Sequence, residues 1–179
     1  EAAAPAADAP KLSLATIPPE VPELPAALQA RPTLHEEMKK RVLAVTSGGA
    51  NKSAGGATMA TQGMGGVGKT TAASALVRDD EVRSAFERLL WVSIGQEPDL
   101  LQLLKVLHFQ LTSSKMPPDV EAERDAVQVL REAAKGMKLL LILDDCWDQK
   151  HASALNCIDA TTNSACVITT RVKNLADAS

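Results

Sequence analysis

Eight consecutive residues in the first half of the chain constrain its fold more than any other segment. Gly63 to Thr70 (Gly-Met-Gly-Gly-Val-Gly-Lys-Thr) match the pattern Gly-x-x-x-x-Gly-Lys-[Ser/Thr] in full. Glycines permit positive φ angles, so the backbone amides of such a loop converge on an oxyanion in front of a helix N-terminus. In that arrangement Lys69 reaches the β- and γ-phosphates and the Thr70 hydroxyl is a ligand for Mg²⁺. A glycine-rich surface turn is the alternative interpretation of so short a pattern.

A second segment joins an apolar run to two acidic residues. Leu139 to Leu143 are all aliphatic, which predicts a buried strand, and Asp144 and Asp145 follow directly. A carboxylate at the carboxyl end of a parallel strand faces the ligand crevice of the sheet. We therefore predict that Asp144 lies on the metal side and that Asp145 orients or deprotonates an attacking water. A solvated Asp-Asp turn after a core strand is the alternative.

A third segment, Ala165 to Thr170, also reads as a strand, and Arg171 comes directly after it. If this strand belongs to the same sheet, Arg171 emerges on the ligand side. Its planar, permanently charged guanidinium would suit contact with a terminal phosphate. A surface arginine that merely ends a strand fits the pattern equally well.

Helical and extended patterns alternate along the remaining chain. This alternation predicts an α/β fold, a parallel sheet of the P-loop NTPase type with helices on both faces. The pair Thr33 and Glu36 has the spacing of a capping box at the start of the first helix. The other expected strands are 57–62 and 89–94, and the expected helices are 33–45, 69–77, one opened by Pro98 and Asp99, and 121–135.

Composition and charge exclude several classes of function. Nineteen Lys and Arg against 22 Asp and Glu give a net charge of −3, which disfavours non-specific binding of nucleic acid. No apolar run approaches the roughly 20 residues that cross a bilayer, and the N-terminus lacks the layout of a secretory signal. The three cysteines form no C-x-x-C pair, so we predict buried free thiols in a reducing compartment and a cytoplasmic location.

The first 27 residues differ from the rest in being rich in alanine and proline. Recurrent prolines remove amide donors and favour extended backbone. We expect residues 1–27 to form a disordered or extended leader and residues 28–179 to form the nucleotide-binding domain. Leu24 and Leu28 are the candidates for packing the leader along that domain.

Together these motifs resemble the NB-ARC domain of disease-resistance-type and apoptotic-protease-activating proteins, a branch of the STAND class of P-loop NTPases. Order and spacing agree over roughly residues 28–179. Two departures are Cys146, where the family commonly has an aliphatic residue, and Ala30 before Arg31, where it usually has glycine. The matching segments are 63–71 (GMGGVGKTT), 89–93 with Gln96 (LLWVS, Q), 139–147 (LLLILDDCW) and 167–171 (VITTR).

The resemblance implies a switch that holds ADP at rest, binds ATP with Mg²⁺, and hydrolyses it slowly. It implies homo-oligomerisation through this domain in the full-length protein. It places the strand before Arg171 between the P-loop strand and the strand before Asp144. The family's adenine-contacting Gly-x-Pro segment and winged helix would follow Ser179, so we expect the domain to be truncated at its C-terminus.

The alternatives are an ordinary P-loop ATPase or kinase and a non-catalytic interaction fragment. The predicted site divides into three sets. Its catalytic residues are Asp145, Lys69 and Arg171, its metal ligands are Thr70 and Asp144, and its nucleotide contacts are Gly63, Met64, Gly65, Gly66, Val67, Gly68, Lys69, Thr70, Thr71 and, from the resemblance, Arg31.

Overall fold

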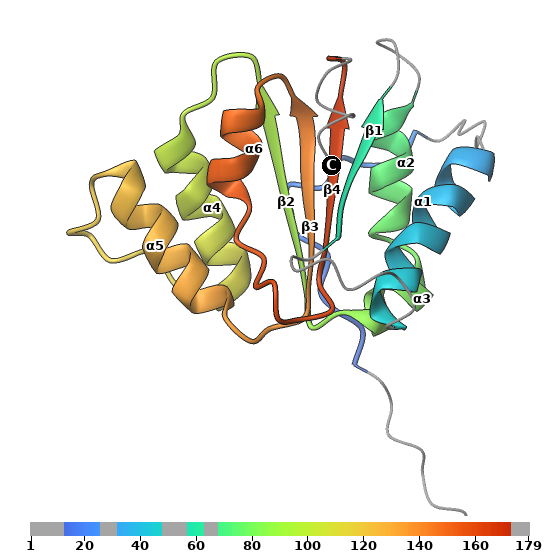
Figure 1. The fold of residues 1–179 in the computed structure, drawn as a ribbon, viewed down its shortest axis with the longest axis horizontal. Coiled ribbons are helices and arrows are strands. Elements are labelled where there is room, and N and C mark those ends of the chain that lie inside the picture. Colours follow the sequence, from blue (N-terminus) through green and yellow to red (C-terminus); the bar gives the residue numbers. More distant parts are fainter. Residues whose placement is uncertain (1–12, 26–31, 48–56, 63–67, 173–179) are drawn as a thin grey trace, which may run out of the picture.

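A four-stranded parallel sheet forms the centre of the molecule (Figure 1). The computed structural model describes residues 13–25, 32–47, 57–62 and 68–172 of the 179. The strand order is β1-β4-β3-β2, which confirms the predicted α/β class and the place of the Arg171 strand between the other two motif strands. The strands are β1 (Ala57–Gln62), β2 (Arg88–Gly95), β3 (Leu139–Cys146) and β4 (Ala165–Thr170).

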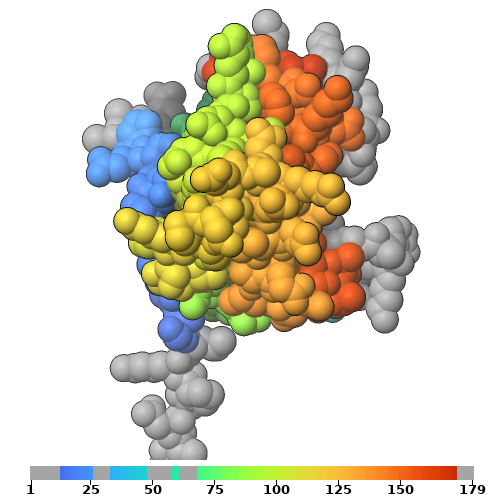
Figure 2. All heavy atoms as spheres, turned by 90° about the vertical axis from the view of Figure 1, so that its left-hand side faces the viewer, coloured from blue at the N-terminus to red at the C-terminus, as the bar shows by residue number. Residues whose placement is uncertain are grey.

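Helices cover both faces of the sheet. One face carries α1, α2 and α3, and the other carries α4, α5 and α6 (Figure 1). Figure 2, seen from the second side, shows α5 lying in front of its neighbours α4 and α6. Within the described ranges, no helix is long and apolar enough to cross a membrane. The helices are α1 (Pro32–Thr46), α2 (Lys69–Leu76), α3 (Asp80–Ala85), α4 (Leu100–Thr112), α5 (Glu123–Ala134) and α6 (Gln149–Leu155).

The central strand β3 explains why both faces need helices. Side chains alternate between the faces of a strand. Leu141 and Leu143 join the core under α4, α5 and α6, whereas Leu140 and Ile142 join the core under α1, α2 and α3. All four are fully buried. An aliphatic residue is therefore favoured at every position from Leu139 to Leu143, as expected for a parallel sheet that is covered on both sides.

The predicted capping box is wrong, because α1 begins at Pro32 and Thr33 therefore lies inside the helix. The other differences from the predicted elements are confined to short or polar segments. The six-residue helix α3 was not predicted, because it is too short to show an apolar stripe. Its N-cap is Asp79, whose carboxylate accepts hydrogen bonds from the amides of Glu81 and Val82 at 3.0 and 3.2 Å. The strand β3 continues through the acidic pair to Cys146, and the helix α6 follows it.

Residues 13–25 contain no helix or strand, make a turn at residues 18–21, and pack beside α2 and α3. The Ala15 amide donates to the carbonyl of Arg83, and the Arg83 Nε donates back to the Ala15 carbonyl, both at 3.0 Å. Ala15 and Val21 are buried in the core under α1, α2 and α3. Leu24, a predicted contact, is half-buried, and Leu28 lies outside the described residues. The division of the chain at residue 28 stays a prediction.

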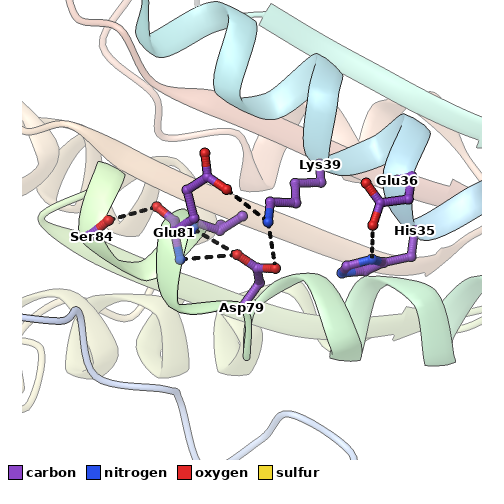
Figure 3. Close-up of polar contacts among 7 residues, drawn as sticks. His35, Glu36, Lys39, Asp79, Glu81 and Ser84 are labelled. Atoms are coloured by element: carbon purple, nitrogen blue, oxygen red, sulfur yellow. Dashed lines mark hydrogen bonds and ion pairs between the residues drawn. The ribbon is translucent and has the colours of Figure 1, made fainter. Parts of the chain in front are cut away.

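A lysine on α1 ties this helix to the start of α3. Lys39 Nζ donates to Asp79 Oδ2 at 2.9 Å and lies 2.8 Å from Glu81 Oε2 (Figure 3). The contact ties together two helices that lie on the same face of the sheet.

The three cysteines are buried and free, as predicted. Burial raises the pKa of Cys157 to about 12 and raises the pKa values of Cys146 and Cys166 above that of an ordinary thiol. The thiols are therefore protonated at neutral pH and pack as small apolar side chains.

Candidate nucleotide-binding site

The last residues of the glycine-rich motif lie at the start of α2, as predicted. Gly68, the N-cap residue, adopts a left-handed conformation with φ 73° and ψ 23°. An added Cβ would meet no atom within 4 Å, so the requirement for glycine is conformational rather than steric. Lys69 is the first residue of the helix. The predicted contacts Gly63 to Val67, and Arg31, lie outside the described residues.

One carboxylate brings two distant hydroxyls together. Thr70 Oγ1 donates to Asp144 Oδ1 at 2.8 Å, although the two residues are 74 positions apart in the chain. Thr169 Oγ1 donates to the same oxygen at 2.6 Å. Asp144 is 4% exposed, so this contact lies at the base of the site rather than on the surface. The predicted pair Thr70 and Asp144 is thus brought into direct contact.

At the two aspartates, β3 contains one more residue than the neighbouring strand β4. Leu143 pairs with Ile168 and Cys146 with Thr170, so Asp144 and Asp145 together oppose the single residue Thr169. Such a bulge redirects side chains at the end of a strand. Asp145 takes a left-handed φ of 53°, and its amide donates to Thr169 Oγ1 at 2.9 Å. The bulge therefore leaves Asp144 buried and exposes a third of the Asp145 side chain.

Arg171 leaves the end of β4 and turns toward Asp145. Its Nε donates to Asp145 Oδ1 at 3.0 Å, and half of its side chain is exposed. The guanidinium carbon lies 5.8 Å from the centroid of the Trp147 ring, within the range of a cation–π contact. The predicted residues Asp145 and Arg171 thus form an ion pair.

Lys69 sits in a partly desolvated position near these charges. The residue is 8% exposed. Burial lowers the pKa of its ammonium group below the ordinary lysine value, and the positive charge of Arg171 lowers it further. The carboxylates of Asp145 and Asp144 act in the opposite direction. Two cations and two carboxylates are thus held close together, an arrangement suited to a phosphate that is accompanied by a metal ion.

These groups surround a cavity of about 280 Å³ at the carboxyl ends of β3 and β4. Ligands of open parallel sheets bind at this edge, where helix N-termini also converge. The lining contains two cations, one carboxylate and three hydroxyls, a composition suited to phosphate and a hard metal ion. The described lining residues are Gly68, Lys69, Thr70, Thr71, Asp145, Thr169 and Arg171.

Two residues of the site were not assigned a role from the sequence. Thr169 touches Asp144 and the Asp145 amide, and Trp147 lies beside Arg171. Both belong to the segments that carried the family resemblance, but nothing in the local pattern separates them from neighbouring core residues. Their roles depend on how β3 and β4 pair, which a linear pattern does not specify.

Comparison with known proteins agrees with this geometry. Residues 35–179 match the model of the NB-ARC domain. The disease resistance RPP13-like protein 4 of Arabidopsis thaliana is 32% identical over 91 residues, or 51% of this chain and 10% of that protein. The disease resistance protein RGA2 of Solanum bulbocastanum is 29% identical over 111 residues, or 60% of this chain and 11% of that protein. The chain thus spans about a tenth of the length of these relatives.

A similar fold occurs in a solved structure of the Drosophila ORC bound to DNA. The TM-score is 0.59 at 16% sequence identity, and the alignment covers 88% of this chain and 42% of that one. At this identity the likeness concerns the fold alone. Since the family model matches most of the chain and the motif residues converge on one cavity, this chain belongs to the NB-ARC family of nucleotide-binding domains.

Proposed function

We propose that this chain binds ADP or ATP together with Mg²⁺ in the cavity at the start of α2, and that it hydrolyses ATP slowly. The bound nucleotide would then define the state of a signalling switch. In this proposal Lys69 contacts the β- and γ-phosphates, and the segment Gly63 to Thr71 surrounds them.

The observation that carries the proposal is the hydrogen bond between Thr70 and Asp144. It joins the hydroxyl that ends the glycine-rich motif to the carboxylate that ends the apolar strand β3. In P-loop NTPases these two groups hold Mg²⁺ beside the phosphates. Their direct contact across 74 residues supports the view that both motifs serve one site.

The donor atoms at this point fit Mg²⁺. This ion takes oxygen ligands and usually binds through one or two carboxylates together with substrate phosphates and water. Thr70 and Asp144 supply a hydroxyl and a carboxylate oxygen. In the part of the chain that the structure describes, no cluster of three or more His, Cys, Asp and Glu side chains could hold a metal by itself, so the nucleotide would complete the coordination.

Slow hydrolysis is consistent with the surroundings of Asp145, the residue proposed to orient the attacking water. One of its carboxylate oxygens already accepts a hydrogen bond from Arg171. The adjacent guanidinium stabilises the charged carboxylate and so makes Asp145 a weaker base toward water. We propose that this pairing lengthens the lifetime of the ATP state.

The relatives suggest the setting in which such a switch would act. Because they are named disease resistance proteins, we propose a defence-signalling role in the cytoplasm for the protein to which this domain belongs. Homo-oligomerisation in the ATP state is part of the same proposal. An ordinary ATPase would instead show rapid multiple turnover and would release its nucleotide.

Calorimetric titration with ADP and Mg²⁺ tests the proposal, with Lys69→Ala as the decisive variant. Loss of a charge-assisted phosphate contact worth about 1.5–3 kcal/mol should weaken binding by roughly 10- to 150-fold. Lys105→Ala, on α4 away from the cavity, serves as the control. Equal affinity of the wild type and Lys69→Ala would contradict the assignment of the site.

A further inference from the structure

We propose that Trp147 is a positioning residue, whose indole ring holds Arg171 at the rim of the cavity for the terminal phosphate of ATP. The inference rests on the proposed function and adds to it a residue that discriminates ATP from ADP. It concerns a side chain that lines no part of the cavity in the described structure.

Two contacts of different kinds restrain the Arg171 guanidinium. Asp145 accepts a hydrogen bond from its Nε at 3.0 Å, and the Trp147 ring lies 5.8 Å from its central carbon. A hydrogen bond to Nε alone leaves the plane free to rotate about that bond. A neighbouring aromatic ring limits this rotation, because the cation is attracted to the ring.

The restrained group retains donors for a ligand. A guanidinium carries five N–H donors, and the ion pair with Asp145 uses the one on Nε. Among the described residues, neither terminal nitrogen of Arg171 has a hydrogen-bond partner. These nitrogens belong to a side chain that lines the cavity together with Lys69. They are therefore suited to a bidentate contact with phosphate oxygens.

Packing alone does not explain an indole at position 147. The Trp147 Nε1 atom is buried and has no hydrogen-bond partner among the described residues. Burying an unpaired N–H costs stability, and phenylalanine or leucine would fill much of the space without that cost. Tryptophan does, however, present the best ring for a cation–π contact. We therefore attribute the indole at this position to its contact with Arg171.

The topology places the two residues together. Trp147 follows the last residue of β3, and Arg171 follows the last residue of β4. These strands are adjacent and parallel, so their carboxyl ends meet at one edge of the sheet (Figure 1). A change in the rotamer of Trp147 would therefore alter the position of the Arg171 guanidinium at the cavity, without involving Lys69 or Thr70.

The test compares binding of ADP and of a non-hydrolysable ATP analogue, each with Mg²⁺, in matched variants. Trp147→Leu removes the ring and should weaken the ATP analogue by roughly 2- to 5-fold, the range expected for a partly exposed cation–π contact. ADP affinity should remain within the error of the measurement. Trp147→Phe keeps a smaller ring that binds a cation less strongly, so its affinity for the ATP analogue should lie between those of the wild type and Trp147→Leu. In an Arg171→Ala background, Trp147→Leu should have no further effect.

Tryptophan fluorescence distinguishes a positioning role of Trp147 from a merely structural one. The emission of the wild type should change when the ATP analogue binds, because Arg171 shifts relative to the ring. The fold should tolerate Arg171→Lys, because half of the Arg171 side chain is exposed. This variant should lose most of the fluorescence change, and its affinity for the ATP analogue should fall by the same 2- to 5-fold. This variant keeps the test decisive if Trp147→Leu does not fold.

Three outcomes would overturn the positioning role. They are an equal loss for ADP and the ATP analogue in Trp147→Leu, an additional loss in the Arg171→Ala background, or an unchanged response in Arg171→Lys. Failure of the proposed function has a separate result, since the wild type would then bind neither nucleotide.

Discussion

Asp144 and Asp145 are adjacent in the chain but occupy different environments. Asp144 is buried and accepts hydrogen bonds from Thr70 and Thr169, whereas Asp145 is partly exposed and pairs with Arg171. The bulge in β3 causes the difference, because it turns both side chains away from the strict alternation of a strand. Two identical residues can thus serve two roles in one site.

This difference predicts a division of labour. Asp144→Ala should weaken nucleotide binding in the presence of Mg²⁺ and have little effect in EDTA, because the lost carboxylate is the proposed metal ligand. Asp145→Ala should preserve binding and slow hydrolysis, since positioning of water matters mainly in the transition state. Calorimetry and single-turnover hydrolysis measure the two effects separately. The opposite pattern would mean that the roles are reversed.

The contact between α1 and α3 depends on the charge of Asp79. Burial alone would raise the pKa of Asp79, but the hydrogen bonds from Lys39 and from the Val82 and Glu81 amides outweigh it and hold the pKa below 3.8. A carboxyl whose pKa is lowered by folding stabilises the protein at pH values above its pKa in the unfolded state. This stabilisation is lost as the pH falls through its pKa in the folded state.

Asp79→Asn should therefore lower the midpoint of thermal unfolding near neutral pH, and the difference from wild type should shrink as pH falls below about 3.8. Asparagine can still cap α3, so the variant removes the charge more than the cap. Asp99→Asn, at the N-cap of α4 where the partner is the Gln102 amide, controls for capping. A pH-independent difference at Asp79 would show that the ion pair contributes nothing.

A glutamine on α4 covers the open edge of β2, which ends the described sheet. Gln110 Oε1 accepts from the Trp91 amide, and Gln110 Nε2 donates to the Trp91 carbonyl, both at 2.8 Å. The same Nε2 donates to Glu20 Oε2 at 2.7 Å. The side chain thus imitates a neighbouring strand, and it blunts an edge that could otherwise pair with a second chain.

Gln110→Leu should destabilise the protein by about 1–3 kcal/mol, the value of two hydrogen bonds to the backbone, and should increase self-association at high concentration. Urea unfolding and sedimentation velocity measure these two effects. Gln102→Leu places the same substitution at an exposed position of the same helix. It should neither destabilise the protein nor increase self-association. Equal behaviour of the two variants would assign Gln110 no role at the edge.

For the whole molecule, the position of the cavity predicts how the nucleotide is recognised. Its described lining comes from the start of α2 and the ends of β3 and β4, where phosphates and metal would lie. We expect ADP and GDP to differ by less than about 1.4 kcal/mol, or tenfold, in competition binding to this 179-residue chain. A strong preference for ADP would instead assign base recognition to the segment around Arg31.

The identity of most elements could be predicted because the information is local. Alternation, caps and apolar runs predicted all four strands and most helices close to their observed bounds. The motif ending in Lys69 and Thr70 and the acidic pair after Leu143 predicted four residues that the structure places at one site. The helix α3 was missed because six residues around one buried valine carry no periodic pattern.

Contacts between distant segments could not be predicted in this way. The part played by Thr169 and the place of Trp147 beside Arg171 depend on the register between β3 and β4. A single extra residue in β3 sets where each of these side chains points. Local propensity specifies that a segment is a strand, and the family resemblance predicted the place of the Arg171 strand in the sheet. The register follows from packing on both faces of the sheet, so only the tertiary structure decided it.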